Sequence, residues 1–342
     1  MSSLQITPEK ILQVGMGFFP SKVMLTAVKL GLFTYLAQGK QTAQWIREKL
    51  GLHDRGFYDF LDALVALGFL KREGIKSTAF YSNTEEVDMF LDKNKPSYVG
   101  GILEMANNRL YPFWNNLEDA LKTGEPQNEA RSGDKSIFEI IYADERKLRE
   151  FLSAMAGVQM GNFMMLAKEF DFTPYKTLCD IGGAGGFLAS EVAKNNSHMD
   201  CISFDLPVVS VIAEENIGAM GLKNKVTVQS GDFFKDPFPK VDIITMGNIL
   251  HDWGLEDKKM LIQKSFNALP EGGLLIVIEN IIDNERRTNA FGLMMSLNML
   301  IETDQGFDYT LEDFESWAIE AGFKHITSMP LRGSSSAAIA RK

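Results

Sequence analysis

Short apolar runs of strand length alternate with helical stretches from residue 176 to the end of the chain. The runs are almost continuously apolar, which is typical of strands that helices cover on both faces of a sheet. Because helical stretches lie between most of them, the strands are expected to run parallel. The sequence therefore predicts an α/β fold with a Rossmann-like, doubly wound and mostly parallel sheet, whose strands lie at 177–182, 201–206, 226–232, 241–247 and 272–279.

The end of the chain adds a helix and an edge to this pattern. The helix is expected to begin at Thr310, where Thr310-x-x-Asp313 is close to a capping box, and to end at Gly322. Two strand-like pieces follow at 325–331 and 335–342. They are expected to form an antiparallel pair at the edge of the sheet.

The first 175 residues have helical rather than strand periodicity. Between residues 57 and 65, apolar side chains recur at spacings of three and four, which indicates a one-sided helix. Two short strand-like pieces around Gly74 follow and resemble a hairpin wing. Three helices before such a hairpin predict an otherwise all-helical, winged-helix-like unit at about residues 20 to 85.

Charge argues against two classes of partner. The 342 residues carry Lys+Arg 35 and Asp+Glu 45, a formal net charge of -10. The helix that would enter a DNA groove holds Asp54, Asp59 and Asp62 against Arg55 alone, whereas phosphate contacts need basic side chains. We therefore expect no nucleic acid and no anionic membrane as partner, and we expect this unit to pack against its own copy.

The compartment is inferred from the cysteines and from the apolar segments. Cys179 and Cys201 both lie in apolar runs and are expected to be buried free thiols in a reducing compartment. The first residues lack a basic stretch, and nowhere do about 18 apolar residues run without interruption. The sequence therefore predicts a cytoplasmic protein with no membrane-spanning segment.

Acidic residues and a histidine follow the predicted strands. Ligands of such sheets bind beyond the carboxyl ends of the strands, near the switch in strand order. The five ends carry Asp180 before a glycine loop, Asp205, Asp232, His251 and Glu279. A single acid at a strand end is usually a turn former or a helix cap, but five such ends in order are poorly explained in that way.

The glycine loop fits one nucleotide-type cofactor better than another. A dinucleotide needs G-x-G-x-x-G, and with Gly183 and Gly185 as the first two glycines the third position is Leu188. S-Adenosylmethionine carries an ammonium and a sulfonium but no phosphate. The carboxylate of Asp180 suits these cations, and the acids after the next two strands suit the ribose hydroxyls and the adenine amine. The acids therefore favour S-adenosylmethionine.

Six segments together resemble a known family. In order along the chain they are DIGGAG (180–185), FDLP (204–207), GDFF (231–234), ILHDW (249–253), LPEGGLLIVIE (269–279) and AGF (321–323). With the N-terminal unit, they look like the plant caffeate-type and bacterial polyketide-type O-methyltransferases, which use S-adenosylmethionine. The similarity covers the chain from about residue 10 to its end.

The resemblance implies a catalytic histidine with two acidic partners. It assigns His251 as the general base, and an imidazole of pKa about 6.5 is suited to taking the proton of a hydroxyl nucleophile. Glu279 resembles one partner of this histidine. Asp308 stands where the family usually has Glu in a GKERT-like segment, and Tyr309 replaces the usual Arg.

The resemblance also implies how the cofactor and the acceptor are held. Plant members carry a Lys near the adenine where Gly247 stands, so that contact is expected to be absent. The implied cofactor-binding residues are Asp180, Gly182, Gly183, Asp205, Asp232 and Phe233.

The 17 methionines concentrate at 160–166 and 291–300. Methionine commonly fills helical cores, which alone accounts for such clusters. In the family, however, the corresponding helices line the acceptor pocket, and the resemblance places Met160, Met164, Met295 and Met299 there. No cluster of His, Cys and Asp has metal-ligand spacing, so no required metal is expected.

Together these observations predict a homodimeric S-adenosylmethionine-dependent O-methyltransferase for a small-molecule hydroxylated acceptor, aromatic or polyketide-like. We expect a dimerisation domain at 1–100, a helical connector lining the acceptor pocket at 101–175, and a cofactor-binding domain at 176–342. Three alternatives remain: an N- or C-methyltransferase or non-methylating relative, a nicotinamide-dependent oxidoreductase, and a winged-helix regulator with a cofactor-sensing domain.

Overall fold

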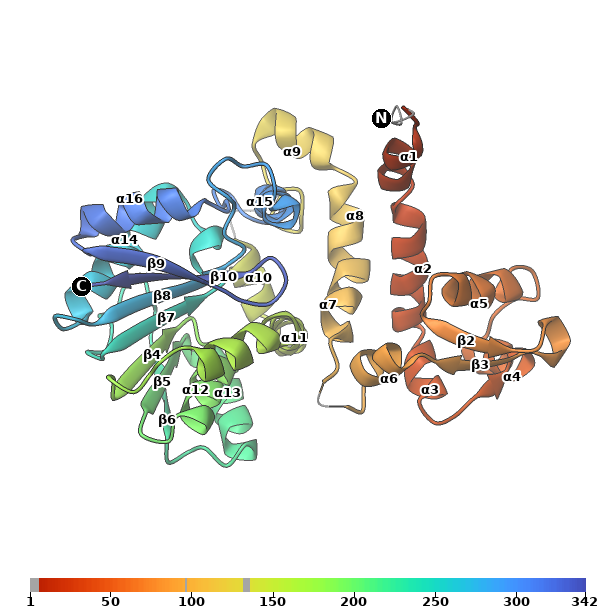
Figure 1. Ribbon diagram of the computed structural model, residues 1–342, viewed down its shortest axis with the longest axis horizontal. Coiled ribbons are helices and arrows are strands. Elements are labelled where there is room, and N and C mark those ends of the chain that lie inside the picture. Colours follow the sequence, from red (N-terminus) through yellow and green to blue (C-terminus); the bar gives the residue numbers. More distant parts are fainter. Residues whose placement is uncertain (1–5, 96, 132–135) are drawn as a thin grey trace, which may run out of the picture. The chain divides into compact units, whose positions relative to one another are not determined.

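The chain divides into two compact units, Met1–Tyr111 and Pro112–Lys342. The computed structural model describes residues 6–95, 97–131 and 136–342 (Figure 1). Each unit has its own apolar core. The domain boundaries expected at residues 100 and 175 stay a prediction.

The first unit is mostly helical, as its periodicity predicts. A small antiparallel sheet accompanies the helices, and β2 and β3 form the hairpin expected around Gly74, whose φ of 81° lies in the left-handed region. The strands, in spatial order, are β1 (Gln41–Thr42), β3 (Phe80–Asn83) and β2 (Leu70–Glu73). The helices are α1 (Glu9–Gly15), α2 (Phe18–Lys29), α3 (Leu32–Leu36), α4 (Ala43–Leu50), α5 (Phe57–Ala66), α6 (Glu85–Leu91), α7 (Gly100–Met105) and a π-helical segment (Ala106–Leu110).

The predicted one-sided helix is α5. Its residues Phe57, Leu61 and Leu64 are buried in the core of the first unit. Because these positions are three and four residues apart, they lie on one face of the helix. The periodicity of the sequence therefore sets which face of α5 packs inward.

Four helices precede the main sheet of the second unit. Two are fixed at their start by side chains: Ser136 and Glu139 form a capping box at one, and the carboxylate of Asp144 accepts hydrogen bonds from the amides of Arg146 and Lys147 at the next. The helices are α8 (Tyr111–Trp114), α9 (Leu117–Thr123), α10 (Ile137–Tyr142) and α11 (Glu145–Glu169).

The main sheet has the predicted strands in the order β6-β5-β4-β7-β8-β10-β9. The first five run parallel, and β10 pairs antiparallel with both β8 and β9. The predicted doubly wound, mostly parallel sheet is therefore confirmed, with β9 at the edge. The strands are β4 (Thr177–Ile181), β5 (Asp200–Asp205), β6 (Val226–Ser230), β7 (Ile243–Gly247), β8 (Leu274–Glu279), β9 (His325–Pro330) and β10 (Ser336–Arg341).

Helices cover both faces of this sheet (Figure 1). One core includes residues of α11, α12 (Phe187–Asn195) and α13 (Pro207–Ala219). The other includes residues of α14 (Leu255–Ala268) and α16 (Leu311–Ala321). A further helix, α15 (Ala290–Glu302), follows β8. The strand order reverses between β4 and β7, and a ligand crevice is expected at the carboxyl ends beside that point.

Two findings bear on the compartment and membrane expectations. Cys179 and Cys201 are buried free thiols, as predicted. By length and composition, the stretch Glu9–Lys29 is apolar enough to cross a membrane, and 17% of its apolar 18-residue window is buried. In the structure this stretch is two helices, α1 and α2, separated at Met16 and Gly17.

Candidate active site

The chemistry-bearing residues gather at the carboxyl edge of the parallel strands. Asp205 and Glu279 are the last residues of β5 and β8, and Asp180 is the penultimate residue of β4. Asp232 follows β6, and His251 lies in the short 3-10 helix η3 (Leu250–Asp252) after β7. Because these five strands are consecutive in the sheet, their ends form one row.

His251 is enclosed by carboxyl groups. Its Nδ1 lies 3.3 Å from Oδ1 of Asp308 and 3.6 Å from Oε2 of Glu279. Its Nε2 lies 3.6 Å from Oδ1 of Asp252, and its backbone amide donates a hydrogen bond of 3.3 Å to Oε1 of Glu279. The side chains of His251, Glu279 and Asp308 are all buried. The structure thus brings together the three residues that the resemblance named as catalytic.

Asp308 reaches this cluster from a distant part of the sequence. A parallel bridge joins Ile282 to Thr310, and the Ile282 amide donates a hydrogen bond of 2.9 Å to the carbonyl of Tyr309. The Asp308 amide donates to Oγ of Ser296 on α15 at 3.2 Å. These backbone contacts place the shorter Asp side chain within reach of the imidazole.

Burial and charge act in opposite directions on the imidazole. Burial disfavours the imidazolium, but the carboxyl groups of Glu279, Asp252 and Asp308 outweigh it and raise the pKa of His251 to about 10. Burial also raises the pKa of Glu279 to about 7 and that of Asp252 to about 6. The carboxyl groups therefore favour the protonated form of the imidazole.

The same cluster has the dimensions of a small metal site. His251, Glu279 and Asp308 each offer one ligand atom, and these atoms lie within 4.8 Å of one another. The electrostatic attraction between a histidine and two acids explains this proximity equally well. The absence of a required metal stays a prediction.

The glycine loop after β4 has no room for side chains. A Cβ on Gly182, whose φ is 69°, would lie 2.3 Å from Cδ1 of Ile249, and one on Gly183 would lie 2.4 Å from Oγ of Ser203. The amides of both glycines donate hydrogen bonds to the carbonyl of Phe204, at 2.9 and 3.1 Å. The loop therefore lies tightly against the end of β5.

Two buried acids face this loop. Oδ1 of Asp180 accepts a hydrogen bond of 2.7 Å from Thr245, and burial raises the pKa of Asp180 to about 7. The carboxylate of Asp205 accepts hydrogen bonds from the amides of Ala184 and Leu206, at 2.8 and 2.7 Å, and burial raises its pKa to about 6. Each carboxylate has further lone pairs for a ligand.

The third acid, Asp232, is less available. Its Oδ2 lies 2.9 Å from Nζ of Lys235, and its Oδ1 accepts a hydrogen bond from the amide of Phe234. Burial raises its pKa, but Lys235 and the backbone donors outweigh this and lower it overall. The neighbouring Phe233 ring lies 5.9 Å, between centroids, from Trp253, and near the Gly182 position.

The four candidate pocket methionines lie on two helices. Met160 and Met164 are on α11, which reaches the end of β7, since Phe163 lies 3.4 Å from where Gly247 would carry a Cβ. Met295 and Met299 are on α15, the helix whose Ser296 contacts the Asp308 amide. Met299 is buried, whereas Met164 is 39% exposed. Their sharing of one acceptor pocket stays a prediction.

Sequence reasoning missed several residues around the site. Trp253 packs against Phe138 of α10 and against Phe234, with ring centroids 5.6 and 4.6 Å apart. Tyr142, also on α10, has its pKa raised by burial and by Asp205 and Asp252. Trp253 follows His251 closely and could have been included, whereas nothing in the sequence links α10 to the strand ends.

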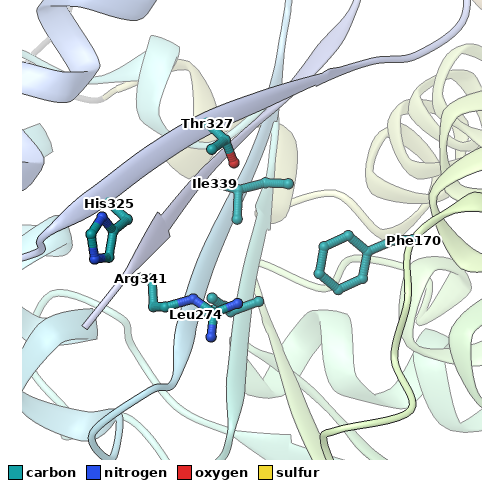
Figure 2. Close-up of a pocket in the computed structure, with 6 residues that line it drawn as sticks. All are labelled: Phe170, Leu274, His325, Thr327, Ile339 and Arg341. Carbon is teal, nitrogen blue, oxygen red and sulfur yellow. The ribbon is translucent and has the colours of Figure 1, made fainter.

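A pocket elsewhere in the second unit is separate from this edge. It is lined by Phe170, Leu274, His325, Thr327, Ile339 and Arg341. Leu274 is the first residue of β8, so the pocket lies at the opposite end of that strand from Glu279. Figure 2 shows Phe170 across from the strand side chains.

Comparison with known proteins identifies the family. A family profile of O-methyltransferase domains matches residues 114–324, and one of O-methyltransferase dimerisation domains matches residues 12–93. The chain belongs to the O-methyltransferase family. This O-methyltransferase uses S-adenosylmethionine as its cofactor, and the alternatives outside this activity are not favoured.

Similar proteins match the methyltransferase along nearly its whole length. The tetracenomycin polyketide synthesis 8-O-methyl transferase TcmO of Streptomyces glaucescens is 39% identical, over 98% of this chain and 97% of its own. The N,N-dimethyltransferase OxyT of Streptomyces rimosus is 31% identical, over 92% and 90%. The structure of human N-acetylserotonin methyltransferase in complex with S-adenosylmethionine aligns with a TM-score of 0.90 at 28% identity, covering 100% of this chain and 99% of that one.

Proposed function

We propose that this methyltransferase methylates a hydroxyl of a small aromatic or polyketide-like metabolite, with His251 as the general base. One observation carries the proposal: a buried imidazole at the end of β7 whose Nδ1 lies 3.3 and 3.6 Å from two carboxylates. The similarity to a polyketide 8-O-methyl transferase at 39% identity supports the acceptor class.

The catalytic step uses the two sides of the imidazole differently. Glu279 and Asp308 hold Nδ1, which fixes the orientation of the ring and stabilises the imidazolium. Nε2 then takes the proton of the acceptor hydroxyl as the oxygen becomes nucleophilic. Bound S-adenosylmethionine supplies the methyl group on a sulfonium. The carboxyl groups that raise the pKa of His251 make it a stronger base, and the step requires the form in which Nε2 carries no proton.

The glycine loop and the strand-end acids fit this cofactor. Gly182 and Gly183 allow a ligand to approach the backbone where any Cβ would clash. Asp180 provides a buried carboxylate for the ammonium, and Asp205 provides one for the ribose hydroxyls. Asp232 and Phe233 flank the adenine in this proposal. Because Lys235 already pairs with Asp232, the Asp232 carboxylate would interact with Lys235 and the adenine amine at the same time.

The acceptor is proposed to lie between the methionine-rich helices. Met160, Met164, Met295 and Met299 would provide a flexible apolar surface for a flat ring system. Both helices reach the edge that carries His251, through Phe163 and through Ser296. In this proposal the helical connector at 101–175 contributes one side of the pocket.

The first unit is proposed to form a homodimer. It matches a dimerisation domain, and α1 and α2 expose Ile11, Val14, Phe18 and Phe19. Large apolar side chains exposed together on consecutive helices are typical of an interaction site. We propose that a second copy covers it, and that the protein acts in the cytoplasm without nucleic acid or membrane as partner.

A labelled cofactor tests the reaction. Incubation with S-adenosylmethionine labelled in its methyl group and a panel of phenols and aromatic polyketides should place the label on oxygen. Aromatic amines and carbon nucleophiles of matched size serve as the comparison panel. Label on nitrogen or carbon alone would contradict O-methylation.

A further inference from the structure

Lys258 occupies a position that is unfavourable for a lysine. Its side chain is completely buried, and it lies one turn from the start of α14, where the positive end of the helix dipole disfavours a cation. Burying an ammonium is costly unless opposite charge compensates it. The groups around Lys258 therefore determine whether its buried charge is compensated.

The direct contacts of the ammonium are neutral. It donates a hydrogen bond to the carbonyl of Trp253. It lies 3.7 Å from the centroid of the Phe307 ring and 5.8 Å from that of Tyr309. Aromatic faces and a carbonyl hold and orient a cation. They do not supply the negative charge that would compensate it.

The compensating charge comes from the candidate active site. The groups that contact the ammonium belong to the residues directly next to Asp252 of η3 and to Asp308 of the loop between α15 and α16. Lys258 interacts electrostatically with both of these acids, with Glu279 of β8 and with Asp257 of its own helix. Glu302 of α15 also acts on Asp252. Three of these acids are the ones that surround His251. If the imidazole is neutral and these acids are ionised, their negative charges lie close together in a buried space and repel one another.

We propose that Lys258 is a positioning residue for methyl transfer, the buried counter-charge that keeps the carboxylates beside His251 ionised. This inference rests on the proposed roles of His251, Glu279 and Asp308. The resembled family has Arg where this chain has Tyr309, next to Asp308. In this chain a cation reaches the Tyr309 side chain from α14, since the ammonium of Lys258 lies 5.8 Å from the centroid of that ring.

The titration behaviour agrees with this arrangement. Burial lowers the pKa of Lys258 to about 8, while the nearby carboxyl groups act in the opposite direction. Lys258 in turn lowers the pKa of Asp252. The ammonium therefore stays charged at neutral pH. Removing it should raise the pKa of Asp252, so that Asp252 is protonated at a pH where it now is not.

Two neutral variants test the proposal. Lys258→Met removes the charge and keeps an apolar chain, and Lys258→Gln removes the charge but can still donate to the Trp253 carbonyl. For both, we expect the acidic limb of kcat against pH to move up by about one unit, so that kcat falls about ten-fold near neutral pH and recovers at higher pH. Adding Tyr309→Arg to Lys258→Met should return the limb toward its original position.

The controls separate charge from folding and from the base itself. Lys259→Met changes the next residue, whose ammonium lies 2.7 Å from Glu320 at the surface, and should leave the profile unchanged. Calorimetry with S-adenosylhomocysteine checks that each variant is folded. A Lys258→Met profile that keeps its acidic limb, or that falls by one factor at every pH, overturns the proposal. When Lys258→Met gives such a result and His251→Ala abolishes turnover in the same assay, the role of Lys258 is refuted and that of His251 is not. Full turnover of His251→Ala would refute the proposed base as well.

Discussion

At the scale of single residues, the site concentrates buried ionisable groups that ordinary packing would avoid. His251, Glu279 and Asp308 are buried together, and Asp180 and Asp205 are buried at the ends of β4 and β5 in the same sheet. Burying such groups costs free energy unless a partner or a ligand compensates it. The pKa values of His251, Glu279, Asp180 and Asp205 are raised, and these shifts predict how binding and turnover depend on pH.

Asp180 should make cofactor affinity depend on pH. Burial raises the pKa of Asp180 to about 7, and a ligand ammonium is bound by the ionised form. Below that pH a proton must leave before binding, so affinity should rise with pH and level off above about pH 7. Titration calorimetry with S-adenosylhomocysteine across about pH 5.5 to 8.5 measures this.

Two variants, one near the carboxyl end of β4 and one at the amino end of the neighbouring strand β5, test whether Asp180 is the group that titrates. Asp180→Asn should weaken binding about ten-fold at high pH and flatten the pH dependence. Asp200→Asn changes an exposed residue at the amino end of β5, paired with Lys225, and should change neither. A pH dependence that survives in Asp180→Asn would assign the titration to another group.

At the scale of elements, local signals were sufficient for most of the second unit. The parallel strands follow continuous apolar runs, and α16 begins and ends at the predicted Thr310 and Gly322, with the capping box formed. The pattern of the sequence could not predict that Asp308 lies beside His251, because its position depends on a bridge between Ile282 and Thr310. Lys258 was missed because its neighbours in the sequence read as a charged surface helix, and burial is decided by tertiary packing.

The loop between β4 and α12 gives a prediction at this scale. Gly182→Ala places a Cβ against Ile249 at a positive φ, and should abolish S-adenosylhomocysteine binding and lower the melting temperature. Gly272→Ala is the matched control, since its φ is 79° with no atom within 4 Å of the added Cβ. It should cost about 1 kcal/mol of stability from backbone strain alone and leave binding intact. Equal effects of the two variants on binding would contradict the proposed close approach at Gly182.

At the scale of the whole molecule, the first unit is expected to determine the oligomeric state. Ile11 and Phe18 are 76% and 49% exposed, and the double variant Ile11→Lys/Phe18→Lys puts charge on the surface formed by α1 and α2. Sedimentation equilibrium should find a dimer for the unchanged chain and a monomer for this variant. Ile319→Lys, at a residue of α16 that is 54% exposed, should leave the dimer intact. A double variant that stays dimeric would place the interface elsewhere.

Removal of the acceptor proton by His251 is tested by the variant His251→Ala. Its kcat should fall by about 10²-fold or more, while calorimetry finds S-adenosylhomocysteine bound with unchanged affinity. His53→Ala, at an exposed histidine of the first unit, should retain full turnover. Unchanged turnover of His251→Ala with the cofactor bound normally would contradict the account.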